Sequence, residues 1–238
     1  GVITSPMGCR AYLSPWHDEK GRYVAIGRCN IGAVSLNIPL IIRLVQLEHP
    51  DNWRTAFWTE LDERLEVIRE FFKKRYDIIR RQKCSSNPLA FTQGGFYEDP
   101  DDEVGDLVRY MTASFGITAL DEATFLWTGK RLLEEGGAFS EEVLRHLQAR
   151  INVFKKEDGW LYAIYGTPAE SLCATQAKQY DAFCAKQGID NVFRHTPHYS
   201  PEYFTNSFHV NVTEEITPFA KAATFSTCVS TIPRTRTQ

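Results

Sequence analysis

The most constraining feature of the sequence is a long stripe of apolar side chains between residues 52 and 83. Its members recur every three or four positions, as on a helix that buries one face: Trp53, Phe57, Leu61, Leu65, Ile68, Phe72, Tyr76 and Ile79. At about 1.5 Å per residue such a helix is on the order of 45 Å long. Asp51 or Asn52 is placed to cap its first turn. A one-sided helix of this length needs a large surface to pack against, and a sheet or a barrel wall provides one.

Short apolar segments are available to build that surface. Residues 23–26 and 33–38 are typical of strands bounded by glycine and proline. Residues 160–165 are short, apolar and aromatic, which indicates a buried strand. Residues 204–213 alternate well enough to form another strand.

Further helices are predicted between these segments. Residues 40–47 form a short one, and another begins within residues 113–122, with Thr118-x-x-Asp121 as its capping box, and ends at Gly136-Gly137. A third runs from Ser140 to about Lys156, with Glu141 and Glu142 in its first turn. The last has Pro168 in its first turn and continues to about Gln187.

Composition excludes several classes of function. The 238 residues suffice for one sizeable domain, and no linker divides them convincingly. A net charge of −3 argues against binding to duplex nucleic acid. No apolar run is long enough to span a membrane, and no signal peptide is present.

The cysteines and acidic residues do not indicate a metal site. The six cysteines show neither a C-x-x-C pair nor the Cys/His spacing of a zinc site, so we expect mostly free thiols in a reducing cytoplasm. The acidic run at 98–103 lacks the turn glycine and the ligand spacing of an EF-hand, so we interpret it as a solvated loop or helix cap.

Three side chains are candidates for chemistry. Pro6 and Gly8 present Cys9 on a turn, and Asn30, in a glycine-flanked bend, can face it. Glu170 follows a strand and a glycine turn at the start of a helix, where free N–H groups favour anions. Each also has an ordinary structural reading: Cys9 as a buried apolar residue, Asn30 as a turn amide, and Glu170 as a surface group that compensates the helix dipole.

Four segments, in this order, carry a resemblance: Met7-Gly-Cys-Arg10; Gly27-Arg-x-Asn30 with Leu36-Asn-Ile-Pro39; Tyr165-Gly-Thr-Pro-Ala-Glu170; and the run from Thr205 to Glu215. Across roughly residues 3 to 225 the chain resembles the middle-to-late catalytic domain of the anaerobic (class III) ribonucleoside-triphosphate reductases, a glycyl-radical family. The resemblance implies an α/β fold that is part of a ten-stranded barrel, with Cys9 on a central finger loop.

The resemblance also implies roles for individual residues. Cys9 becomes a thiyl radical that abstracts the 3′-hydrogen of the ribose, Glu170 acts on the 3′-hydroxyl, and Asn30 holds the ribose hydroxyls. The combination of Met7, Asn30 and Glu170 resembles the subgroup that uses formate as reductant. The remaining matched positions would line the pocket or contact the substrate phosphates: Met7, Tyr165, Gly166, Thr167 and Ser171.

Other parts of such an enzyme find no match here. These are the nucleotide-effector sites, a zinc site, and the glycine whose radical is installed by an activating enzyme that uses S-adenosylmethionine and an iron–sulfur cluster. Residues 1–225 are therefore expected to be a partial catalytic domain, and the unmatched tail, 226–238, to be disordered. A complete enzyme would be a cytoplasmic homodimer, and this chain alone is predicted to be inactive.

Three other functions remain open. Another glycyl-radical enzyme, of the formate-lyase or dehydratase type, is disfavoured by the segments at 165–170 and 206–209. A thiol hydrolase would use Cys9 with a loop histidine and needs a thiolate of depressed pKa. A non-catalytic nucleotide-binding remnant is the third.

Overall fold

The computed structural model describes residues 13–24, 28–93 and 96–206, except for the side chains of Leu133, Glu135 and Glu170. Within them lies one parallel sheet of three strands in the order of the chain: β1 (Asn30–Leu36), β2 (Thr112–Ile117) and β3 (Leu161–Gly166). Because the strands are parallel, long connections return the chain to the same edge each time. Among the described residues, β1 and β3 are hydrogen-bonded on one side only.

The strands are in level register. Asn30 pairs with Thr112 and Thr112 with Leu161 at the amino end, while Ile117 pairs with Gly166 at the carboxyl end. The only shift between β1 and β2 lies at Asn30 and Gly32. All three strands therefore end at the same edge of the sheet.

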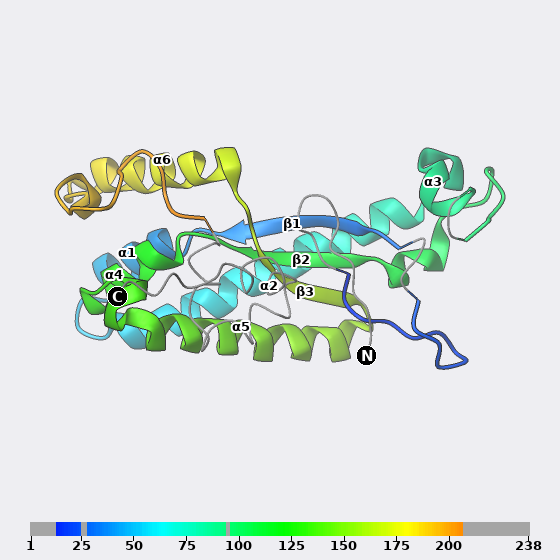
Figure 1. Cartoon of the computed structure of the whole chain (residues 1–238), viewed down its shortest axis with the longest axis horizontal. Helices are drawn as coiled ribbons and strands as arrows, with labels where there is room; N and C mark the ends of the chain where they lie inside the picture. The colour runs from blue at the N-terminus through cyan, green and yellow to red at the C-terminus, as the bar shows by residue number, and fades with distance from the viewer. Residues whose placement is uncertain (1–12, 25–27, 94–95, 207–238) are drawn as a thin grey trace, which may run out of the picture.

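Helices fill the connections (Figure 1). Between β1 and β2 lie α1 (Ile38–Glu48), α2 (Trp53–Arg80), α3 (Pro88–Phe91) and the 3-10 turns Cys84–Ser86 and Gly105–Tyr110. Between β2 and β3 lie α4 (Leu120–Thr128), a π-helical turn (Leu132–Gly136) and α5 (Gly137–Asp158). After β3 come α6 (Glu170–Gln187) and the 3-10 turn Val192–Arg194.

The main core lies between the sheet and the helices α2 and α5. The rings of Phe72 on α2 and Phe115 on β2 are 5.3 Å apart, and those of Phe115 and Phe154 on α5 are 5.9 Å apart. The predicted stripe on α2 is confirmed, because its buried members are the ones that face this core: Phe57, Leu61, Leu65, Ile68, Phe72 and Tyr76. The surface that the long helix required is the sheet.

A charged contact ties α2 to the end of α5. Arg69 donates from Nε and Nη2 to the two carboxylate oxygens of Asp158, at 2.8 and 2.6 Å, and the Tyr162 hydroxyl donates to Oδ2 at 2.9 Å. Burial alone would raise the pKa of Asp158, but the bonds from Arg69 and Tyr162 outweigh it and lower that pKa. The pair is bidentate and nearly buried, the geometry in which such contacts are strongest.

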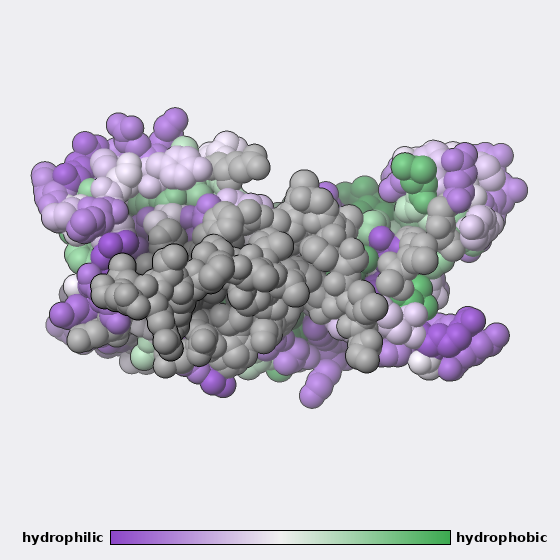
Figure 2. Space-filling model, viewed as in Figure 1, coloured by the Kyte–Doolittle hydropathy of each residue, from purple (hydrophilic) through white to green (hydrophobic). Residues whose placement is uncertain are grey.

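A second, smaller core forms around α6. It joins Ala177, Tyr180 and Cys184 of α6 to Phe193 and Phe204 of the following segment. Figure 2 shows mostly hydrophilic residues over the outer surface of α6, which agrees with its exposed Lys178, Gln179 and Lys186.

The prediction that a helix begins within residues 113–122 is wrong for its first part. Residues 112–117 form β2, every one of them buried, and α4 begins only at Leu120 and ends at Thr128. Thr118 forms no capping box, because the residue before the helix is Ala119, with φ of 55°. A central strand covered on both faces lacks the alternation that identifies a half-buried strand, and this one consists mainly of small residues.

Other boundaries also differ. Residues 33–38 do not form one strand, because Asn37 leaves the sheet and caps α1, accepting from Leu40 N at 3.4 Å. Asn52 precedes α2 without a side-chain capping bond, and Pro168 lies before α6 rather than in its first turn. The helix predicted at Ser140 begins three residues earlier, at Gly137.

The two remaining predicted strands, at residues 23–26 and 204–213, lie only partly within the described residues. Tyr23 forms only an isolated antiparallel bridge with His17, and residues 25–27 lie outside the described part. Residues 204–206 are irregular, and the rest of the predicted strand at 204–213 is likewise outside. The predictions of α1, β3 and the end of α6 at Gln187 are confirmed. Within the described residues, no helix is both long and apolar enough to cross a membrane.

Candidate functional site

The predicted site residues fall into two groups. Met7 and Cys9 lie outside the described residues, and of Glu170 only the backbone is described, as the first residue of α6. Asn30 and a set at the end of β3 are described fully: Tyr165, Gly166, Thr167 and Ser171.

Asn30 is the first residue of β1 rather than part of a bend, which corrects the sequence interpretation. Its Nδ2 donates to Ser114 Oγ at 2.7 Å, and its Oδ1 accepts from Gly32 N at 2.8 Å. The Gly32 N–H requires an oxygen opposite it, so the orientation of the carboxamide is fixed. Since Ser114 alternates with Phe115 on β2, both polar groups lie on the sheet face opposite α2 and α5, where Ser114 is fully buried.

Arg28, two residues earlier, fastens the preceding loop to the sheet. Its guanidinium donates to the carbonyl oxygens of Ser14 at 2.6 Å, Tyr110 at 2.7 Å and Val24 at 3.0 Å. Ser14 N in turn donates to Thr112 Oγ1 at 3.0 Å. The chain that follows the Cys9 segment is therefore anchored beside Thr112, the register partner of Asn30.

At the other end of the sheet, the chain leaving β3 crosses β2 and β1 and enters α6 on the far side of β1 (Figure 1). During this crossing the hydroxyls of Thr167 and Ser35 meet at 2.7 Å, and Thr167 N donates to Ile117 O at 3.2 Å. Gly116 makes room for the contact, because a Cβ at that position would lie 2.1 Å from Ser35 Oγ.

The crossing ends at Ala169, whose φ of 63° turns the chain into α6. The amino end of an 18-residue helix thus lies beyond the carboxyl edge of a parallel sheet. Unpaired N–H groups at such a terminus favour phosphates and carboxylates, and this edge is where open parallel sheets bind ligands. Ser171, in the first turn, is exposed.

Tyr165, Gly166 and Thr167 follow one another at the carboxyl end of β3 and Ser171 lies in the first turn of α6, whereas Asn30 lies at the opposite end of the strands. The residue of β3 level with Asn30 is Leu161, four positions before Tyr165, a distance of about 13 Å along the strand. Tyr165 and Asn30 share the sheet face opposite α2 and α5. The convergence of Cys9, Asn30 and Glu170 on one cavity stays a prediction.

Sequence reasoning missed a buried carboxylate in the first turn of α4. Glu122 is 1% exposed and accepts from Thr205 N at 2.7 Å and from Thr205 Oγ1 at 2.6 Å. Burial raises the pKa of Glu122 to about 7, although both Thr205 bonds act to lower it. Ala119 N also donates to Thr205 O at 3.0 Å, so this end of α4 holds the start of the matched segment at 205–215.

The prediction of free thiols is confirmed for the described cysteines: Cys29, Cys84, Cys173 and Cys184. Desolvation by burial raises the pKa of each, and for Cys173 the charge of Glu122 adds to this, giving about 11. None of these four has the depressed pKa of a hydrolase thiolate.

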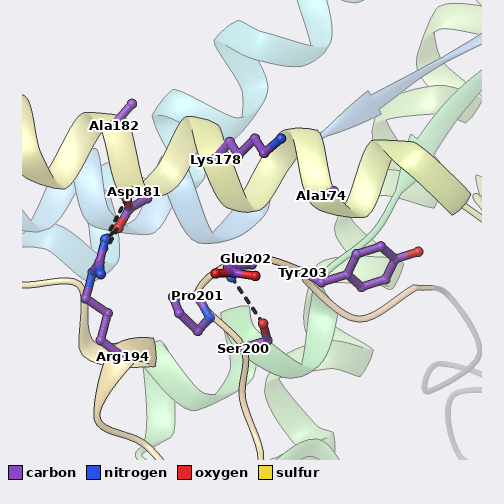
Figure 3. Close-up of a pocket in the computed structure, with 9 residues that line it drawn as sticks. All are labelled: Ala174, Lys178, Asp181, Ala182, Arg194, Ser200, Pro201, Glu202 and Tyr203. Atoms are coloured by element: carbon purple, nitrogen blue, oxygen red, sulfur yellow. Dashed lines mark hydrogen bonds and ion pairs between the residues drawn. The ribbon is translucent and has the colours of Figure 1, made fainter.

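A cavity of about 580 Å³ lies between α6 and residues 200–203 (Figure 3). Asp181, at its wall, is already bound by Arg194 Nη2, at 2.7 and 2.8 Å, and by Asn191 Nδ2 at 2.8 Å. None of the predicted site residues whose side chains the structure describes lines this cavity. Within the described residues there is also no cluster of metal-binding side chains.

Comparison with known proteins decides the family. The family model described as anaerobic ribonucleoside-triphosphate reductase matches residues 2–230, nearly the whole chain. The chain belongs to this family. Similar relatives are the anaerobic ribonucleoside-triphosphate reductases of Salmonella typhimurium, 31% identical over 233 residues, and of phage T4, 30% identical over 225 residues.

These alignments cover 93% and 92% of this chain but only 30% and 34% of the two relatives, so the chain spans about a third of an anaerobic ribonucleoside-triphosphate reductase. Among solved structures, the anaerobic ribonucleotide reductase of Thermotoga maritima with glycerol in its active site matches with a TM-score of 0.52. It is 21% identical, and the match covers 75% of this chain and 28% of that one. The structure of the same enzyme in complex with dATP and CTP also matches with a TM-score of 0.52. It is 18% identical, and the match covers 83% of this chain and 33% of that one. These matches support the predicted α/β fold.

Proposed function

We propose that this chain is part of the catalytic subunit of an anaerobic ribonucleotide reductase, and that the sheet face opposite α2 and α5 is turned toward a ribonucleoside triphosphate. One observation carries the proposal beyond family membership. The fixed carboxamide of Asn30 and the Thr167 hydroxyl lie on a single sheet face, which leads to the amino end of α6. Sugar hydroxyls need such fixed amide and hydroxyl partners, and phosphates suit the helix terminus.

In this proposal Asn30 holds the ribose hydroxyls, and Met7 and Tyr165 line the pocket. Gly166, Thr167 and Ser171 contact the phosphates at the start of α6. Cys9 is the radical-bearing thiol. Ser14 donates to Thr112, the register partner of Asn30, and five residues span at most about 18 Å, which supports a place for Cys9 near the amino end of the sheet in this proposal.

The chemistry follows from these roles. The Cys9 thiyl radical takes the 3′-hydrogen atom, the 3′-hydroxyl proton passes to Glu170, and the 2′-hydroxyl leaves as water. Formate then supplies the two electrons and becomes carbon dioxide, while the 3′-hydrogen returns and Cys9 is again a thiyl radical. The net reaction converts one ribonucleotide, one formate and one proton into a deoxyribonucleotide, carbon dioxide and water. A positioned, desolvated carboxylate suits the proton transfer.

The proposal also includes what the rest of the enzyme would supply. A glycyl radical, installed by an activating enzyme that uses S-adenosylmethionine and an iron–sulfur cluster, would generate the thiyl radical. The three strands would form part of a ten-stranded barrel with Cys9 on its finger loop, in a cytoplasmic homodimer with nucleotide effectors and a zinc site on other segments.

A chimera tests this function. Residues 2–206 would replace the matching region of the phage T4 relative, and the product would be assayed anaerobically with CTP, formate and the activating enzyme. We expect deoxynucleotide that is lost in C9S and N30A but kept in the matched control C84S, whose thiol is buried in the core. Full turnover by C9S would contradict the proposal. The isolated chain is expected to form no product.

A further inference from the structure

Gln176 is a buried amide two turns into α6, only 2% exposed. Its Nε2 donates to Leu36 O, the last carbonyl of β1, at 3.2 Å. Its Oε1 accepts from the hydroxyl of Thr118, which follows β2. One side chain therefore joins α6 to the carboxyl ends of two strands.

Asn37, which follows β1, adds a hydrogen bond from its side chain to the backbone of Gln176. Its Nδ2 donates to Gln176 O at 3.1 Å, while its Oδ1 caps α1. The amino end of α1 and the second turn of α6 thus share one residue at the end of β1.

The start of α6 is held on both sides by adjacent residues of β1. Thr167, before the helix, bonds to Ser35, and Gln176, six positions after Glu170, bonds to Leu36. The first turn of α6 therefore lies between two hydrogen bonds that both connect to β1. Gln176 is about 9 Å along the helix axis from Glu170.

The residues of α6 that belong to the second core all follow Gln176 in the sequence: Ala177, Tyr180 and Cys184. Before Gln176, the buried Cys173 contributes a further polar tie, accepting at its carbonyl from Phe204 N at 3.3 Å. The position of the first turn therefore depends on these hydrogen bonds together with the packing of Cys173.

We propose that Gln176 is a positioning residue: through Leu36 and Thr118 it sets the place of the first turn of α6, and so of the phosphate contacts and Glu170. This rests on the proposed function, because that function assigns the phosphates to the start of α6. Gln176 itself touches no substrate in this proposal.

The test uses the full 238-residue chain and two variants of the same contact. Q176M keeps the length of the side chain but removes its hydrogen bonds to Leu36 and Thr118. T118V removes the hydroxyl that donates to Gln176 Oε1. T118S keeps that hydroxyl and should rescue the effect. T124V is the matched control, because it breaks another buried hydroxyl pair, Thr124 with Ser140 at 2.7 Å, which joins α4 to α5 away from the start of α6.

Two readouts separate positioning from general stability. Hydrogen exchange followed by mass spectrometry reports the peptide covering residues 168–176, and calorimetry reports the affinity for CTP with Mg²⁺. In Q176M we expect exchange of this peptide to rise about tenfold and CTP affinity to fall about tenfold, as for a lost buried hydrogen bond, with a smaller effect in T118V. T118S and T124V should resemble the wild type both in the exchange of this peptide and in CTP affinity. This should hold for T124V even if it lowers the melting temperature as much as Q176M does.

Unchanged exchange at 168–176 in Q176M, or a rise spread evenly over the chain, would overturn the proposal. So would faster exchange with unchanged CTP affinity, because Gln176 would then not position the site. If the wild-type chain does not bind CTP, the function assigned to α6 fails in this chain, while a local rise in exchange still supports the positioning of the first turn by Gln176.

Discussion

The hydroxyl oxygens of Ser35 and Thr167 lie 2.7 Å apart, although they belong to β1 and to the turn after β3, which are separated by β2. The contact crosses Gly116 of the central strand. A Cβ there would lie 2.1 Å from Ser35 Oγ and 2.5 Å from Thr167 Oγ1. A single missing side chain thus lets the chain pass over the sheet to α6.

The first prediction follows from that crowding. G116A should lower the free energy of unfolding by about 1–3 kcal/mol, the usual cost of an overpacked site, measured by urea denaturation. S35A removes the nearest atom, so the double variant S35A/G116A should lose less than the sum of the two single variants. Full additivity would show that the two residues do not meet.

The second prediction compares two arginines of α2. R69M should cost about 3 kcal/mol of stability, because it leaves the nearly buried Asp158 without its bidentate partner. R64M is the matched control: Arg64 pairs with Glu60 on the surface and its side chain is 51% exposed, so the loss should stay below about 1 kcal/mol. Equal losses in urea denaturation would contradict this account.

The third prediction concerns pH. The pKa of Glu122 is about 7 in the folded chain, against 4.5 for the ordinary side chain, because burial disfavours the charge. Between these values the folded state holds a proton that the unfolded state has released, so stability should fall as pH rises from about 5 to 7, by up to roughly 3 kcal/mol. The measurement is the urea midpoint as a function of pH.

E122Q provides the control for this slope. Its amide can still accept from Thr205 N and can donate to Thr205 Oγ1, but it does not titrate. Stability of E122Q should therefore vary much less between pH 5 and 7 and should exceed that of the wild type at pH 8. An unchanged slope in E122Q would assign the pH dependence to another group.

The fourth prediction tests the orientation of Asn30. S114A and N30A each remove the 2.7 Å bond between these side chains, and each should cost about 1 kcal/mol. The double variant should show a coupling energy of about 0.5–1 kcal/mol in a double-mutant cycle. A coupling of zero would mean that Ser114 does not hold the carboxamide.

Much of the fold was predictable where a single periodic signal dominates. The stripe on α2 is long enough to be unambiguous, and β3 is a short aromatic run that ends at a glycine. The sequence predicts that residues 113–122 begin a helix, with Thr118-x-x-Asp121 as its capping box. That prediction misses β2, because a strand buried on both faces shows no alternation.

The site was predictable only in part. Family motifs identify Thr167, but its partner Ser35 is 132 positions away, and their contact depends on the absence of a side chain at Gly116. Glu122 was missed because an acidic residue in a first helical turn is normally exposed and compensates the dipole. Its burial depends on Thr205, which is 83 residues later in the chain.

Among the described residues, the sheet ends on both sides in strands that pair with another strand on one side only. Unsatisfied amides and carbonyls along a strand recruit any extended peptide of matching pattern, including another copy of the same molecule. Handling this polypeptide apart from the remaining two-thirds of such a reductase should therefore favour self-association that increases with concentration, and adding strands that pair with these two margins should suppress it.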